Sequence, residues 1–203
     1  MSTLRDELTG SVRPTPYTIL MPPGWRKVAP AELTSEDAAA LSLRAMREAG
    51  RPDLVLQVRG MLSRFRASLR ESRAFDAYLP PAVDGVMLPA AMLVAPFVLP
   101  SGVEWDAAAS RMAKGAEVER PDGTETPMLM WRRAEKVADD VATLVGRTSH
   151  YLVPVDEPGT RRALHFQYTV LVADSAQIAD AVDTLEGLGD LMMATMRWRV
   201  PAA

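Results

Sequence analysis

The two histidines of the chain come nearest to a pair of residues that could carry out acid-base or metal chemistry. His150 and His165 lie on two extended segments of alternating apolar residues, joined by the turn sequence Asp156-Glu157-Pro158-Gly159. In the register that matches the apolar positions, both histidines lie on the opposite face of the sheet. The positions that set this register are Tyr151, Val153, Leu164, Phe166 and Tyr168. A zinc site needs more protein ligands than this pair supplies, so we predict a shared face and no metal.

Acidic pairs are the next candidates for chemistry, and both lie in predicted turns. Asp139-Asp140 and Asp156-Glu157 are adjacent residues, which point apart in an extended chain, and acidic residues in turns commonly bond their own backbone. The chain has no glycine-rich phosphate loop, no Gly-x-Ser-x-Gly and no His-Glu-x-x-His. We therefore predict no catalytic residues and no cofactor.

Four arginines lie beside the apolar stripe of a helix that is predicted to begin near Pro52. They are Arg59, Arg66, Arg70 and Arg73. Guanidinium groups pair with phosphates and carboxylates, so this flank could bind an anion or orient an acidic partner. A solvated flank is the favoured interpretation, in which the long stems cover the edges of the stripe while the charges stay in water.

The chain has 12 methionines, whose flexible thioethers suit surfaces that accept varied apolar partners. We expect an exposed apolar patch near the central strands or the last helix, and we choose Met128, Met130, Met192 and Met193 as partner-binding residues. Packing in the core is the alternative for most methionines. The arginine flank completes the predicted partner site.

Composition limits the classes of protein to which the chain can belong. It is 48% hydrophobic and 24% charged, has a net charge of -3 and a pI near 5.5, and contains no cysteine. These values are typical of a globular domain, argue against general nucleic-acid binding, and exclude disulfides. Residues 1–10 do not resemble a signal peptide, and the uncharged run 86–102 is too short and proline-rich to span a membrane. We expect a cytoplasmic protein without stable membrane insertion.

The hydrophobic pattern predicts one α+β domain over residues 1–203, in which residues 1–13 could form a flexible N-terminal segment. A mainly antiparallel sheet flanked by helices is expected, with Trp25 and Trp198 at least partly buried. A helix that follows Asp174 packs on the sheet, with Gly189 allowing close approach and its acidic side facing outward. The predicted strands are 17–21, 75–79, 86–98, 116–119, 128–131, 148–155, 161–172 and one that includes Arg197 and Trp198. The other predicted helices are 34–49, one from Pro52, and 105–114.

The ends of the chain carry a resemblance to a known family. A strand that ends in Pro22-Pro23-Gly24-Trp25, a central antiparallel meander, and a helix that runs into Met196-Arg197-Trp198-Arg199-Val200 together resemble the PsbP-like superfamily. Its members include LpqN-type lipoproteins and Eag-type effector chaperones. The resemblance implies an antiparallel sheet with helices on its faces, no shared active site, and a role that depends on protein surfaces.

These observations favour a non-enzymatic protein-binding module. The expected form is a cytosolic chaperone or adaptor that covers an apolar segment of a client protein, and a link to secretion is one form this role could take. A small-molecule-binding protein or enzyme with a pocket between sheet and helices, using His150 or His165, is the first alternative. A structural subunit of a larger assembly is the second.

Overall fold

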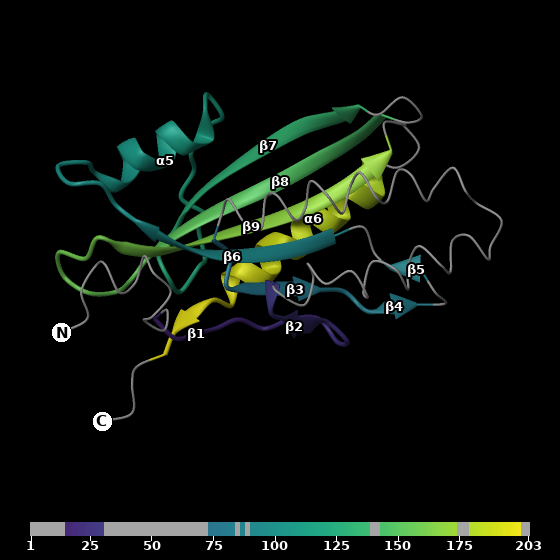
Figure 1. The fold of residues 1–203 in the computed structure, drawn as a ribbon, viewed down its shortest axis with the longest axis horizontal. Coiled ribbons are helices and arrows are strands. Elements are labelled where there is room, and N and C mark those ends of the chain that lie inside the picture. The colour runs from purple at the N-terminus through teal and green to yellow at the C-terminus, as the bar shows by residue number, and fades with distance from the viewer. Residues whose placement is uncertain are drawn as a thin grey trace.

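The chain folds around one antiparallel sheet, with helices on both of its faces (Figure 1). The computed structural model describes residues 15–30, 73–83, 86–87, 90–138, 143–173 and 179–199. The predicted helix 34–49, most of the predicted helix from Pro52, and the N-terminal segment 1–13 lie outside the described residues. The described part of the chain confirms the predicted α+β class.

Six strands form the main sheet, in the order β2-β3-β6-β9-β8-β7. Every neighbouring pair in this sheet is antiparallel. Short strands at one edge give way to long ones across the centre and the other edge. Their bounds are β2 Arg26–Val28, β3 Asp76–Leu79, β6 Ala90–Val98, β9 Arg162–Ala173, β8 Thr143–Pro154 and β7 Leu129–Ala138.

The β8–β9 hairpin has the register that the sequence predicts. Tyr151 lies opposite Phe166 and Val153 lies opposite Leu164, so the apolar faces of the two strands coincide. The turn closes with the Val155 amide donating to the Arg162 carbonyl at 2.9 Å. Gly159 adopts a φ of 69°, which glycine tolerates without steric cost.

The first and last strands do not join the main sheet, which corrects the predicted arrangement. β1 is only Tyr17–Thr18 and pairs antiparallel with β10, Arg197–Trp198, as a separate two-stranded sheet. The Pro22-Pro23 dipeptide lacks backbone donors, and the chain turns there, with the Trp25 amide donating to the Pro22 carbonyl at 3.2 Å. The chain therefore enters the main sheet only after this turn, at β2. A second small sheet pairs β4, Ala82–Val83, with β5, Val86–Met87.

The segments predicted as strands at 116–119 and 128–131 are joined by one bridge. Glu119 and Met130 exchange two backbone hydrogen bonds of 2.8 Å, and the 116–119 segment forms no strand of its own. Further along this connection, the buried Thr126 hydroxyl donates to the Met196 carbonyl at 2.8 Å. The segment is thus directed toward the end of the last helix instead of along β7.

The two described helices cover opposite faces of the sheet (Figure 1). α6, Ala179–Ala194, lies along one face, and α5, Trp105–Ala113, lies against the other. Lys114, with a φ of 50°, ends α5. Within the described residues, neither helix has the length and apolar character needed to cross a membrane.

The main core lies between the sheet and α6. Gly189 of α6 approaches the Tyr168 ring so closely that a Cβ atom there would lie 2.5 Å from ring atom Cδ1. This contact confirms the predicted role of the glycine. Trp25 and Trp198 pack against the same core and are half-buried, as predicted.

Candidate functional site

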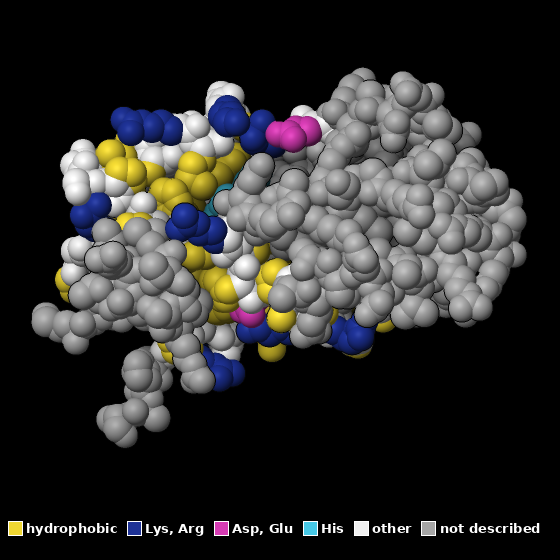
Figure 2. Space-filling model, viewed as in Figure 1, with side chains coloured by type: hydrophobic (Ala, Val, Ile, Leu, Met, Phe, Trp, Pro, Cys, Tyr) yellow, Lys and Arg dark blue, Asp and Glu magenta, His cyan; other side chains and the backbone are white. Residues whose placement is uncertain are grey.

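Polar and aromatic side chains gather on the sheet face opposite α6. In register across the strands, Trp131 of β7 lies opposite His150 of β8, which lies opposite Gln167 of β9. The next row toward the other end of the strands holds Arg133 and Thr148. Figure 2 shows this side of the molecule, with hydrophobic side chains gathered beside a histidine and Lys and Arg side chains around them. α5 contacts this face at the Trp131 end.

Three rings on this face are stacked on one another. The Trp131 and His150 rings are 5.1 Å apart between centroids and 11° from parallel. His165 lies 5.6 Å from Trp131 and 5.2 Å from His150, with interplanar angles of 22° and 19°. The prediction that the histidines share one face is therefore confirmed.

The two histidines and Gln167 form a chain of hydrogen bonds. His150 Nδ1 lies 3.1 Å from His165 Nε2, and His165 Nδ1 lies 3.4 Å from the Gln167 side-chain nitrogen. If the Gln167 amide donates, His165 Nε2 carries a proton and donates to His150, so the His150 proton is on Nε2. In this arrangement the chain of bonds presents an N–H donor at its outer end.

Burial keeps both histidines neutral. Desolvation lowers the pKa of His150 to about 4, and the positive charge of Arg133 contributes in the same direction. Desolvation lowers the pKa of His165 to about 3, with a further contribution from His150. Among the described residues, no three His, Cys, Asp or Glu side chains converge as metal ligands. The pair can therefore relay hydrogen bonds as neutral imidazoles, and the absence of bound metal stays a prediction.

Several hydrogen-bond donors lie on this face, and one of them has no acceptor. Trp131 is 1% exposed, and its indole N–H is buried without a hydrogen-bond partner. The Arg133 guanidinium pairs with Glu135 at 2.7 Å, although the Glu135 side chain is 64% exposed. The Thr148 and Thr169 hydroxyls are 3.0 Å apart. The sequence did not predict these donors, because the order of residues does not show whether a tryptophan N–H is buried or finds an acceptor.

A second polar cluster joins β1 to the main sheet. The Tyr17 hydroxyl donates to Asp76 at 2.8 Å and lies 2.9 Å from the Tyr78 hydroxyl, while the Lys27 ammonium bonds Asp76 at 2.7 Å. Desolvation raises the pKa of both tyrosines, so each phenol stays protonated. The cluster therefore fixes the position of β1 through hydrogen bonds of two neutral phenols and one ion pair.

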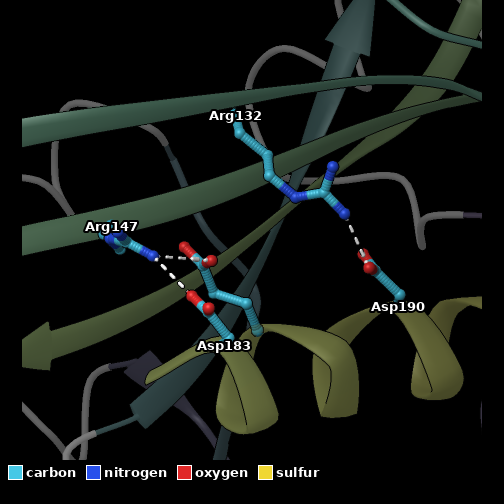
Figure 3. A network of polar contacts seen from close by, with 5 residues as sticks. Arg132, Arg147, Asp183 and Asp190 are labelled. Carbon is cyan, nitrogen blue, oxygen red and sulfur yellow. Dashed lines mark hydrogen bonds and ion pairs between the residues drawn. The ribbon is translucent and has the colours of Figure 1, made fainter. Parts of the chain in front are cut away.

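Arginines of the sheet hold the acidic side of α6 (Figure 3). Arg132 bonds Asp190 at 2.6 Å, and the Tyr151 hydroxyl donates to the same carboxylate at 2.5 Å. Arg147 bonds Asp183 at 3.0 Å and Glu186 at 3.1 Å. The acidic side was expected to face outward, but these carboxylates reach back to the sheet, because Arg132 and Arg147 lie on the sheet face that α6 covers. The contacts fix α6 against the sheet.

The four methionines chosen as partner-binding residues do not form an exposed patch. Met128, Met130, Met192 and Met193 are at most 4% exposed and lie in the core between the sheet and α6. The expected patch at these residues is wrong, because Met130 faces α6 and the two helix methionines face the sheet. The alternative of core packing is correct for them. Arg73 is exposed, and Arg59, Arg66 and Arg70 lie outside the described residues.

Exposed apolar surface occurs elsewhere near α6. Among the described residues, the large hydrophobic side chains that are exposed are Leu20, at 72%, and Leu191, at 68%. The Leu20 amide donates to the Thr195 hydroxyl at 2.9 Å, and Leu191 lies one helical turn before Thr195. We call these two residues the leucine patch. The sequence signal was the position of Leu191 outside the apolar stripe of the predicted helix.

Comparisons with known proteins found similarity in structure and none in sequence. No protein-family model matches the chain, and no curated protein matches its sequence. Its structure is similar to the crystal structure of LpqN, a protein involved in cell envelope biogenesis of Mycobacterium tuberculosis, with 11% identity, a TM-score of 0.43, and 96% of each chain covered. It is also similar to a crystal structure from Bacteroides thetaiotaomicron, with 10% identity and a TM-score of 0.35.

The second similarity covers 62% of this chain and only 39% of the length of the Bacteroides chain. The similarity to LpqN, at a TM-score of 0.43, is one of fold only and does not test the resemblance expected from the sequence. Membership of the PsbP-like superfamily stays a prediction, and neither similarity is high enough to carry a functional assignment.

Proposed function

We propose that the chain is a non-enzymatic protein-binding module, a cytosolic chaperone or adaptor that covers an apolar segment of a client protein. The leucine patch is the observation that carries this proposal. Single exposed hydrophobic residues are common on monomeric proteins, whereas large contiguous apolar patches mark sites for a partner. The amide of Leu20 bonds Thr195 just beyond the end of α6, and Leu191 is exposed one helical turn before Thr195.

Contacts around the leucine patch hold its backbone in place before a client binds. Leu191 lies next to Asp190, which Arg132 and Tyr151 both bond, and Leu20 is tied to Thr195 through its amide. Because the backbone beneath both leucines is held by these contacts, little further ordering is needed when a client binds. Met21 follows Leu20 in sequence, and Leu188 lies three residues before Leu191 in α6. Both are half-buried and would extend the apolar contact of the patch.

The energy available at the patch sets the expected affinity. Burying an exposed leucine side chain contributes roughly 1.5 to 3 kcal/mol, so the two leucines supply about 3 to 6 kcal/mol before ordering costs. This is less than the roughly 8 kcal/mol of a micromolar complex. A stable client complex would therefore need further contacts. The arginine flank, which comprises Arg59, Arg66, Arg70 and Arg73, is the proposed source of orientation for an acidic client.

The test is co-purification of a client from native cytosol with matched variants. We expect a stoichiometric protein to purify with the unaltered chain, to be lost with Leu20→Glu combined with Leu191→Glu, and to be retained with two glutamates at exposed positions Ala107 and Ser110 of α5. Circular dichroism confirms that each variant is folded. Retention of the client by the leucine variant would show that the patch is not the binding surface.

Salt and the arginine flank provide an independent check on the same complex. Burial of apolar surface is little affected by salt, so the dissociation rate should change little between low and physiological ionic strength. Charge reversal at Arg66 and Arg70 should slow association without abolishing binding. If charge reversal at Arg66 and Arg70 abolishes binding while the leucine variant still binds the client, an anionic ligand becomes the better interpretation.

A further inference from the structure

We propose that the sheet face formed by Trp131, His150 and Arg133 binds a carboxylate group. This site lies on the face opposite α6, so it is separate from the leucine patch and goes beyond the proposed binding of an apolar client. The inference rests on the N–H donors that the fold brings together on this face and on the acceptor that the Trp131 indole lacks.

The three residues are neighbours on one face because of the β7–β8 register. Trp131 lies directly opposite His150, and Arg133 follows Trp131 two positions later on the same face. Thr148, opposite Arg133, adds a hydroxyl to the same row. Arg133, Thr148 and His150 are half-buried, so solvent and a small acidic group can reach them in part.

Hydrogen-bond donors predominate among the described polar atoms at this face. The buried Trp131 indole N–H has no acceptor, and an indole nitrogen can only donate. The bond chain from Gln167 through His165 leaves the His150 proton on Nε2, which is a second donor. Arg133 contributes the fixed charge and several N–H groups. A carboxylate offers about four lone-pair positions for such a set of donors.

The carboxylate of Glu135, which pairs with Arg133, is a weak competitor for a ligand. Glu135 pairs with Arg133 at 2.7 Å, but the two side chains are 64% and 29% exposed, respectively. Exposed pairs of this kind contribute little, because water and salt screen them. A ligand carboxylate can therefore replace Glu135 at the guanidinium. With one arginine and neutral histidines, the face suits a singly charged carboxylate better than a phosphate dianion.

Nuclear magnetic resonance of the ¹⁵N-labelled full chain tests the site. The probe is glutamate blocked at both ends, and blocked glutamine is its uncharged match. We expect the Trp131 indole N–H resonance, identified with Trp131→Phe, to shift saturably with blocked glutamate and not with blocked glutamine. Arg133→Gln should weaken the response by about tenfold or more, while Arg111→Gln on α5 should leave it unchanged.

Two sources of the carboxylate are distinguished by a third titration. Acetate stands for a free small acid, and blocked glutamate stands for an acidic residue of a protein. Binding of blocked glutamate at least about tenfold tighter than acetate supports a protein source, whereas equal affinities support a small acid. An equal response to blocked glutamine, an undiminished response in Arg133→Gln, or no saturable shift with either acid overturns the proposal.

The leucine variant separates this proposal from the proposed function. Leu20→Glu combined with Leu191→Glu should keep the indole response to blocked glutamate, because the leucine patch lies on the other side of the sheet. Loss of the client with an intact carboxylate response supports both proposals. Retention of the client with an intact response overturns the function and leaves the carboxylate site standing.

Discussion

Burial determines the protonation state of His150 and His165. Each imidazole shares its face of the sheet with the Trp131 ring, and both have a pKa well below the ordinary value of 6.5. A neutral imidazole has one donor and one acceptor nitrogen, which is what a chain of hydrogen bonds through two rings requires. The charged form would place two donors face to face and break that chain.

This burial predicts a pH dependence of stability. The folded-state pKa values, about 4 for His150 and about 3 for His165, lie below the unfolded value of 6.5, so the unfolded chain binds more protons between these limits. The contribution of the histidines to the free energy of unfolding is therefore fully present above pH 6.5. It is lost as the pH drops toward 4, by up to about 1.4 kcal/mol per pH unit for each histidine.

Urea unfolding of the unaltered chain and of a His150→Gln, His165→Gln variant measures this effect. Because carboxylates titrate mainly below pH 5, the comparison belongs between pH 6.5 and 5. We expect the free energy of unfolding to decrease over that range in the unaltered chain and to be nearly constant in the variant. Equal slopes would show that the histidines are not buried as neutral groups.

At the scale of elements, the close approach of α6 to the sheet depends on one glycine. A Cβ atom at Gly189 would lie 2.5 to 2.9 Å from three atoms of the Tyr168 ring, whereas a Cβ at Gly187 would meet no atom within 4 Å. Tyr168 is fully buried and also stacks on Trp25 at 6.3 Å, so its ring has little freedom to move.

Two substitutions on the same helix therefore have opposite expected effects. Gly189→Ala should lower the free energy of unfolding by about 1 to 3 kcal/mol, because α6 or the tyrosine must shift. Gly187→Ala should raise it by up to about 1 kcal/mol, because alanine favours the helix. Urea unfolding at neutral pH measures both. A stabilising Gly189→Ala change would show that α6 does not pack on Tyr168 as described.

At the scale of the whole molecule, the core joins residues from both ends of the described chain. Tyr17 packs edge-on against Phe166 at 5.3 Å, and the Trp198 indole donates to the Pro154 carbonyl at 3.1 Å. The β1–β10 pair thus rests on the central strands instead of extending the sheet. Loss of either end should therefore affect the whole core.

Replacement of Trp198 by alanine tests this dependence. We expect a loss of about 2 to 3 kcal/mol, below the range for a fully buried tryptophan because Trp198 is half-buried. Amide hydrogen exchange should show the same loss of protection in β6 and β9 as in β10, because these elements share one core. Lost protection confined to β1 and β10 would show that the two-stranded sheet opens independently.

The local pattern of the sequence was sufficient for the β8–β9 hairpin. Alternation of apolar residues around a Pro-Gly turn predicted that Tyr151 faces Phe166 and that the histidines share the other face. Both features depend on residues close in sequence and on the two-residue period of a strand. The spacing of Gly189 in its helix predicted close packing for the same kind of local reason.

The environment of the methionines and the positions of the end strands depended on the tertiary structure. Whether Met130 is exposed depends on α6, which follows it by about fifty residues, and no local period encodes where that helix lies. The same holds for β1, which pairs with a strand from the other end of the chain, and for Arg132, which bonds Asp190 of α6. Residue order determines which face a side chain occupies within its element. The element that packs against a face decides which of its side chains are buried and which form ion pairs. It also decides that the Trp131 indole N–H is buried without an acceptor.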